Sequence, residues 1–288
     1  AQWPTPPAQV PPPPPPPPPR RRPPMPASAT ATVVINAEPS AVWPFLSDQA
    51  RFLAWMTFIP GMPAPAGSIF QPHPGGTLLV KFPNGGQAKG KVLDLDPARR
   101  LVFTWGYDPD VAKTGLGPGA TRVEMVLEST SEGARVTLTH GGPMSDKLAH
   151  EHAAGWRHHL SQLAVQSAME FHQSRLADAL AAYFRAFSEP DAAKRDALLA
   201  SCSEDAVHLR TAFACTDGRA DLSAHIANGL KHMPGCTLAQ NGMVNHIHGV
   251  ARVPWKVASP EGKMIFKGEN IVRFSPAGKI AEIVGFQG

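Results

Sequence analysis

A change in the spacing of apolar side chains near Met144 is the feature that most constrains the fold of this chain. Before that point, short segments alternate apolar and polar residues, as in 121–128, which is the pattern of a strand with one buried face. After it, apolar residues recur at helical spacing along 148–163 and form one stripe of a long helix. The chain is therefore expected to build a sheet first and to close it with a helix.

The segments before Met144 define that sheet in more detail. A strand is predicted over 31–36 and a short helix over 38–47, which Pro44 shortens or kinks. Turn signals then separate further strand-like runs at 77–82, 90–96, 101–107, 121–128 and 134–140. This order predicts a helix-grip fold, in which a curved sheet wraps the closing helix and leaves a cavity between them.

Particular residues in this half also resemble a known family. Asp94 through Trp105, Val136 through His140, and His152 through Trp156, followed by Leu160 and Leu163, are similar to the activator of heat-shock-protein-90 ATPase homologue family. That family lies in the START-like (SRPBCC) superfamily. The resemblance covers about residues 30–168 and implies a helix-grip fold with a hydrophobic cavity more than it implies a reaction.

The second half shows helices first and strands afterwards. Amphipathic helices are predicted over 174–187, 192–201 and 219–233, with a short strand after Ser203. Four strand-like runs follow at 238–248, 250–259, 264–274 and 280–286. Three helices followed by a meander suit a cone of bent sheet closed by helices.

Four segments of this half resemble the SnoaL-like group of the nuclear transport factor 2-like superfamily. They are Leu198 through His208, Thr216 through Arg219, His246 through Trp255, and Gly268 through Phe286. The resemblance implies an α+β cone and leaves the chemistry open, because that superfamily includes isomerases, polyketide cyclases, dehydratases and members without catalytic activity. The fold class is thus α+β, with a START-like domain at 31–168 and a SnoaL-like domain at 172–288.

Residues 1–30 are expected to form a disordered, proline-rich tail. Fifteen of the 32 prolines and the triplet Arg20, Arg21 and Arg22 lie there, and polyproline has no amide donors for a sheet or helix. From Ala31 onward, 24 Lys and Arg face 23 Asp and Glu, so the folded part has no basic excess for binding nucleic acid. A membrane span and a disulfide framework are not expected either, and the predicted location is the cytoplasm.

The candidate acid or base groups lie in the second half, because the resemblance places such a group inside the cone. They are Asp205, Asp217, His246, His248 and Glu269. The two histidines are predicted to share one face of a strand, facing either the cone or its outside. Asp205 and Asp217 have the competing interpretations of a helix cap and a turn residue.

The candidate ligand-contacting residues are mostly tryptophans, namely Trp43, Trp55, Trp105, Trp156 and Trp255, with Arg252 beside the last. Core packing explains the first four equally well. No metal or cofactor is assigned, because the sequence 150–154 lacks the second histidine of an HExxH motif.

The expected partner is a small apolar molecule, with a possible homodimer through the carboxy-terminal domain. The first functional hypothesis is a two-domain binder of such molecules, with or without cofactor-free isomerase, cyclase or dehydratase chemistry of the ketosteroid isomerase or polyketide cyclase kind. The second is a non-enzymatic carrier, sensor or dimerising adaptor. The third is a co-chaperone-like ATPase activator, although no charged docking stripe is visible in the first half.

Overall fold

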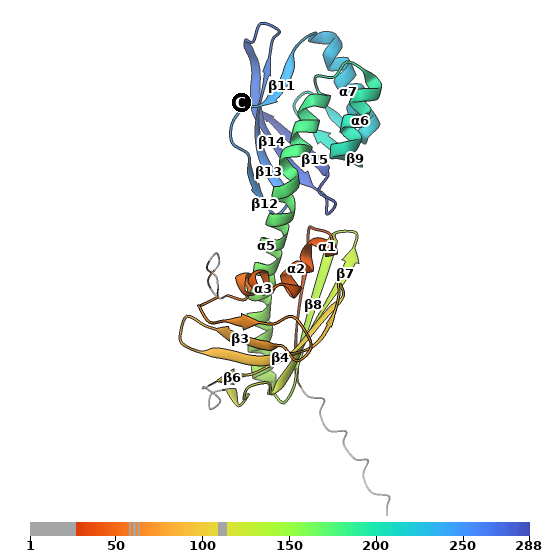
Figure 1. Cartoon of the computed structure of the whole chain (residues 1–288). Helices are drawn as coiled ribbons and strands as arrows, with labels where there is room; N and C mark the ends of the chain where they lie inside the picture. The colour runs from red at the N-terminus through yellow and green to blue at the C-terminus, as the bar shows by residue number, and fades with distance from the viewer. Residues whose placement is uncertain (1–26, 58, 60–61, 63, 109–113) are drawn as a thin grey trace, which may run out of the picture.

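The computed structural model describes residues 27–57, 59, 62, 64–108 and 114–288. The predicted proline-rich tail lies outside these residues, except that the first strand, β1, begins at Ser28 and so takes in the end of that segment. Within the described residues, two sheets lie at opposite ends of one long helix (Figure 1).

The first sheet is antiparallel, with the order β1-β8-β7-β5-β4-β3-β2 and with β6 paired to β4. Its strands are β1 (Ser28–Ile35), β2 (Ile69–Phe70), β3 (Thr77–Lys81), β4 (Gln87–Asp96), β5 (Arg100–Trp105), β6 (Tyr107–Asp108), β7 (Thr121–Thr130) and β8 (Gly133–Gly141). The predicted alternation is confirmed in β7, where Val123, Met125 and Leu127 are buried. The predicted helix near 38–47 becomes α1 (Pro39–Val42) and α2 (Pro44–Ser47), because a proline begins each of them. A third helix, α3 (Gln49–Trp55), follows.

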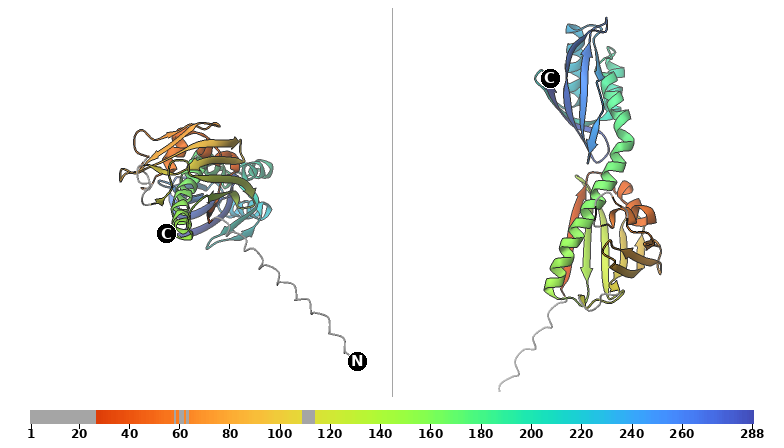
Figure 2. Two further views of the ribbon diagram at one scale, coloured as in Figure 1. Left: turned by 90° about the horizontal axis from the view of Figure 1, so that it is seen from below. Right: turned by 90° about the vertical axis from the view of Figure 1, so that its left-hand side faces the viewer.

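Helix α5 (Asp146–Ala186) is the element that the two halves share. The sequence indicates a closing helix near 148–163 and a separate helix at 174–187, but the structure joins them, because no proline or glycine lies between Gly155 and Ala186. Trp156, Leu160 and Leu163 belong to the first hydrophobic core, whereas Leu176, Leu180 and Tyr183 belong to the second. Figure 2 shows the helix running from one sheet to the other.

The second sheet has the order β10-β9-β15-β14-β13-β11, with β12 paired to β13. The strands are β9 (Ser203–Arg210), β10 (Cys215–Asp217), β11 (Thr237–Gln240), β12 (Asn245–Ile247), β13 (Val250–Ala258), β14 (Met264–Phe274) and β15 (Ile280–Gln287). Helices α6 (Ala192–Cys202) and α7 (Arg219–His232) pack beside it. Register shifts at Val257/Ala258 and Arg273/Phe274 are irregularities of the kind that bend a sheet. The predicted α+β class, with a helix-grip half and a cone-shaped half, is confirmed.

One predicted strand, at 238–248, is divided in the structure. β11 ends at Gln240 and β12 begins at Asn245, and His248 has a φ of 50° in the turn to β13. A left-handed residue cannot continue a strand, so the prediction that His246 and His248 share one strand face is wrong.

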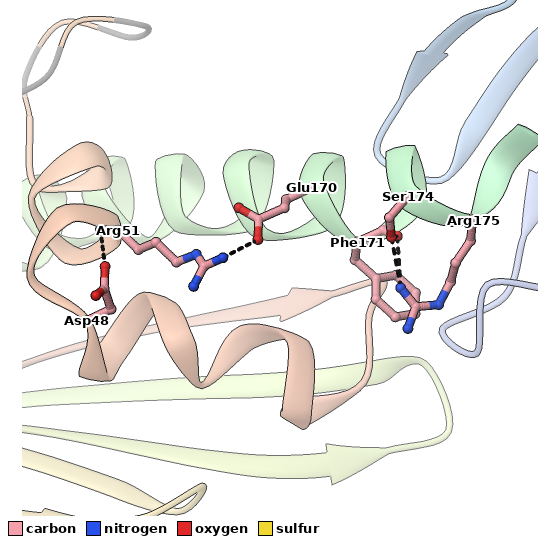
Figure 3. Close-up of polar contacts among 6 residues, drawn as sticks. All are labelled: Asp48, Arg51, Glu170, Phe171, Ser174 and Arg175. Atoms are coloured by element: carbon pink, nitrogen blue, oxygen red, sulfur yellow. Dashed lines mark hydrogen bonds and ion pairs between the residues drawn. The ribbon is translucent and has the colours of Figure 1, made fainter.

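An ion pair joins helix α3 to helix α5, and local polar contacts lie on either side of it (Figure 3). Asp48 caps α3 by accepting from the Arg51 amide at 3.0 Å, and the Arg51 guanidinium Nη2 donates to Glu170 Oε1 at 2.7 Å. Further along α5, the Arg175 guanidinium lies 4.1 Å from the centre of the Phe171 ring and donates to Ser174 Oγ. Among the described helices, none is long and apolar enough to cross a membrane.

Candidate functional site

A cavity of about 320 Å³ lies in the second half, between the concave face of the sheet and the helices. That volume is within the range of small-molecule sites in proteins. Its walls come from α5, α7 and strands β9, β11, β13, β14 and β15, and most of the lining is aliphatic or aromatic. Exposed Phe213 and Met233 lie among the lining residues, and the Phe213 ring centroid is 5.9 Å from that of Phe266.

Trp255 is the one sequence-predicted ligand residue that lines this cavity. It occupies the inward face of β13, opposite Gly268 on β14. A Cβ atom at Gly268 would lie 2.5 Å from Trp255 Cζ2, so only glycine leaves room for the indole there. The glycine and the tryptophan therefore shape one wall of the cavity together.

Two further polar side chains face the cavity without a protein partner. Asn270 is 5% exposed and Tyr183 is 2% exposed, and no hydrogen bond joins either side chain to another described residue. Burial raises the pKa of Tyr183 above its ordinary value, so the hydroxyl keeps its proton and can donate it in a hydrogen bond.

His225 is the histidine that lines the cavity. It lies on α7 next to buried Ile226, and burial lowers its pKa, so the imidazole is neutral at neutral pH. Sequence reasoning missed this residue, although the helical spacing of Leu222, Ile226 and Leu230 places position 225 beside the same inward face. The sequence indicates Tyr183 only as part of an apolar helix face.

The five predicted acid or base groups are not among the residues that line the cavity. The Asp205 side chain is 86% exposed and forms an ion pair with Arg219. Glu269 Oε1 lies 3.3 Å from Nε of Arg252, the other predicted ligand contact, and both side chains are about half exposed on the outer face of the sheet.

Asp217 and the two histidines also lie elsewhere. Asp217 accepts hydrogen bonds from Arg210 and from His208 Nδ1, and these bonds lower its pKa. His246 lies at the joint between the two halves, with its ring centroid 5.6 Å from that of His172, whereas His248 is exposed. A catalytic role for the five residues stays a prediction, and the geometry of the cavity does not support it.

The predicted tryptophans of the first half pack between the sheet and helix α5. Trp55 is fully buried and donates from Nε1 to the Phe45 carbonyl at 2.8 Å, and the ring centroids of Trp105 and Trp156 lie 5.2 Å apart. Trp43 is partly buried at the edge of the same core. Contact of these four residues with a ligand stays a prediction.

A buried hydrogen-bonded chain runs beside these indoles. Trp156 Nε1 donates to His140 Nδ1 at 3.0 Å, and Thr121 Oγ1 lies 2.7 Å from both His140 Nε2 and the Trp105 carbonyl. Since the threonine hydroxyl must donate to the carbonyl, it accepts from His140, whose proton is then on Nε2. Burial lowers the pKa of His140 to about 3, with a smaller contribution from His152, so the ring is neutral.

Comparisons with known proteins give one family match and several similar solved structures. Residues 36–167, slightly less than half of the chain, match the family described as "Activator of Hsp90 ATPase homolog 1-like protein". A solved AHSA1 protein from Silicibacter pomeroyi is 26% identical, with 50% of this chain and 99% of that chain covered and a TM-score of 0.42. A dimeric protein from Colwellia psychrerythraea is 23% identical, with 48% and 92% covered and a TM-score of 0.35.

A protein of the SnoaL-like family from Agrobacterium tumefaciens is 22% identical, with 40% of this chain and 98% of that chain covered and a TM-score of 0.38. The comparison with curated proteins gives no match. The amino-terminal part of the chain, residues 36–167, thus resembles the activator of Hsp90 ATPase homologue family.

Proposed function

We propose that the protein binds small apolar molecules in the cavity of its carboxy-terminal half. The observation that carries this proposal is the cavity itself, about 320 Å³ of mainly apolar wall, in which the buried Trp255 Nε1 has no partner among the described residues. Transfer of a hydrophobic molecule from water to apolar walls is favourable in free energy, and a few polar groups fix its orientation.

A cavity-filling variant tests the proposal. Gly229 of α7 lines the cavity, and a Cβ atom there would meet nothing within 4 Å, so Gly229→Leu projects a side chain into the empty space. The matched control is Gly155→Leu, at another helical glycine with open space around it but away from the cavity. Binding is measured by isothermal titration calorimetry with an uncharged naphthalene derivative as the ligand.

The wild type and Gly155→Leu are expected to bind 2-acetylnaphthalene with the same affinity, and Gly229→Leu to bind it at least 10-fold more weakly. Both variants should keep the circular dichroism spectrum of the wild type. Equal binding by all three proteins would place the ligand outside this cavity, and the absence of binding by the wild type would overturn the proposal.

Proton transfer on the bound molecule is a second candidate, favoured by His225. A neutral imidazole beside an apolar cavity has the protonation state that a general base needs. His225→Gln should then abolish turnover of a bound enone while leaving its binding intact. If binding persists in the wild type without turnover, the carrier or sensor alternative is the one that holds.

Two macromolecular partners are also proposed, each from a different observation. The outer face of the second sheet exposes Ile247 and Phe286, at 64% and 59%, and we propose that two copies pair there. Sedimentation should show a dimer that Phe286→Ser dissociates, and a monomeric wild type would refute it.

The family match over 36–167 also motivates an ATPase assay with Hsp90, in which a flat titration excludes activation.

A further inference from the structure

The carboxamide of Asn270 is a polar group of the cavity that can act as both donor and acceptor toward a ligand. It lies on the inward face of β14, between Val253 of β13 and Gly285 of β15. The residue lines the cavity and is 95% buried, since its exposed fraction is 5%, and no hydrogen bond joins its carboxamide to another described residue. A ligand that fills the cavity must supply hydrogen bonds to this carboxamide or leave it unsatisfied.

The surroundings of Asn270 keep the carboxamide open to the cavity. A Cβ atom at Gly285 would lie 2.7 Å from Asn270 Oδ1 and 2.8 Å from Thr211 Cγ2. Only a glycine therefore fits beneath the carboxamide. Both polar atoms of Asn270 consequently remain available, one as an acceptor and the other as a donor, whichever way the amide group is turned.

The charge of the lining restricts the ligand further. Among the described residues that line the cavity there is no Asp, Glu, Lys or Arg, and the phenol of Tyr183 is uncharged. An ionised ligand would give up its hydration without gaining a counter-charge, which is costly in an apolar site. The walls therefore select for molecules that carry no charge.

We propose that the cavity takes an uncharged apolar molecule with an amide-like edge, a C=O beside an N–H, that pairs with the Asn270 carboxamide. This inference rests on the binding function proposed above. The C=O of the ligand accepts from Asn270 Nδ2 while its N–H donates to Asn270 Oδ1, so that both atoms are satisfied at once. A ketone satisfies only the donor, and a hydrocarbon satisfies neither.

Four naphthalenes of nearly equal shape test this pairing. They are 2-naphthamide, 2-acetylnaphthalene, 2-isopropenylnaphthalene and 2-naphthoate, titrated into the full chain at pH 7.5 by calorimetry. We expect the amide to bind about 5-fold more tightly than the ketone and the ketone about 5-fold more tightly than the hydrocarbon, as one net hydrogen bond each provides. The carboxylate should bind most weakly.

Two variants assign the effect to its residue. Asn270→Leu keeps the approximate volume but removes both polar atoms, so the amide, the ketone and the hydrocarbon should bind it with similar affinity. Gly285→Ala leaves the carboxamide present but crowds Oδ1, and it should remove the preference of the amide over the ketone. Because Gly285→Ala keeps Asn270, it provides a second readout if Asn270→Leu does not fold.

The outcomes separate this inference from the proposed function. If the amide binds no better than the ketone, or if Asn270→Leu keeps the wild-type order, the amide pairing is wrong while apolar binding stands. If 2-naphthoate binds most tightly, the exclusion of charged ligands is also wrong. If none of the four molecules binds, the proposed binding function itself fails.

Discussion

The imidazole of His172 on helix α5 faces that of His246 on strand β12 across the joint between the two halves, with ring centroids 5.6 Å apart. His172 Nε2 lies 2.7 Å from the Asn36 carbonyl and must therefore donate, whereas His246 Nε2 accepts from the Gly249 amide at 2.9 Å. The neutral rings are thus held in opposite tautomers, and Nδ1 of each is buried without a partner.

The first prediction is that acid loosens this joint. Burial lowers the pKa of both histidines. The neighbouring His246 and Arg175 add to the shift of His172, which the Asn36 carbonyl opposes, and His248 adds to the shift of His246. When the contact between His172 and His246 opens, both rings reach water and bind protons more readily than in the closed contact. The closed contact is therefore destabilised as pH falls below the ordinary histidine pKa of about 6.5.

Hydrogen exchange at the Gly249 amide measures this directly, because a protonated His246 Nε2 can no longer accept from it. Protection of that amide is expected to fall between pH 7 and pH 5, after correction for intrinsic exchange. In His246→Ala the protection should be low at every pH. A wild-type protection factor that is flat over this range would refute the prediction.

The second prediction concerns the close approach at Gly249, where a Cβ atom would lie 2.3 Å from Asn36 Nδ2 and 2.8 Å from His172 Nε2. Gly249→Ala should therefore break the joint in addition to straining a backbone with a φ of 76°. Gly262→Ala is the matched control, since its φ is 83° but its Cβ would meet nothing within 4 Å. We expect the control to lose about 1 kcal/mol of unfolding free energy and Gly249→Ala at least about twice that. Equal losses in urea denaturation would contradict this account.

The third prediction concerns His140 of the first core, whose pKa is lowered to about 3. Its unfolded pKa is near 6.5, so the unfolded chain binds one more proton between pH 6.5 and pH 3 and stability falls as pH drops through this window. The contribution at pH 4 is on the order of 3 kcal/mol. His140→Gln, which can still accept from Trp156 but cannot titrate, should show a shallower loss of unfolding free energy from pH 6.5 to pH 4. A slope identical to that of the wild type would rule out His140 as its source.

The fourth prediction compares two contacts near the start of α3 (Figure 3). Arg51 and Glu170 form an ion pair at 2.7 Å, but their side chains are 43% and 56% exposed, so Glu170→Gln should cost less than about 0.5 kcal/mol. Asp48→Ala removes a helix cap and should cost about 1 kcal/mol. Thermal or urea unfolding of the two variants distinguishes them, and a larger loss for Glu170→Gln than for Asp48→Ala would show that the ion pair outweighs the cap.

Much of the fold could be predicted from the sequence because burial imposes regular patterns on it. Alternation in β7 and the helical stripe of Trp156, Leu160 and Leu163 are consequences of one buried face each. The continuity of α5 was not predicted, because its apolar stripe changes partners from one core to the other near Phe171. A local pattern records which residues are buried but not against which sheet.

The site was predictable only in part. Trp255 was found because it lies on a strand with clear alternation, and it does line the cavity. Asn270, Tyr183 and His225 were missed, because a polar residue on an inward face is visible only once the sheet register and helix packing are known. The prediction that His246 and His248 share one strand face failed because the chain turns at His248. Nothing in the local composition indicates that this histidine adopts a left-handed backbone conformation.

The single helix that contributes to both cores also fixes how one half is rotated relative to the other about the helix axis. An α-helix advances about 100° and about 1.5 Å for every residue. One residue inserted into α5 near Phe171 would therefore turn the cone by more than a quarter of a circle against the helix-grip half and separate His172 from Asn36 or from His246. A flexible linker would absorb such a change, but in this chain the number of residues in the helix sets which face of one domain looks toward the other.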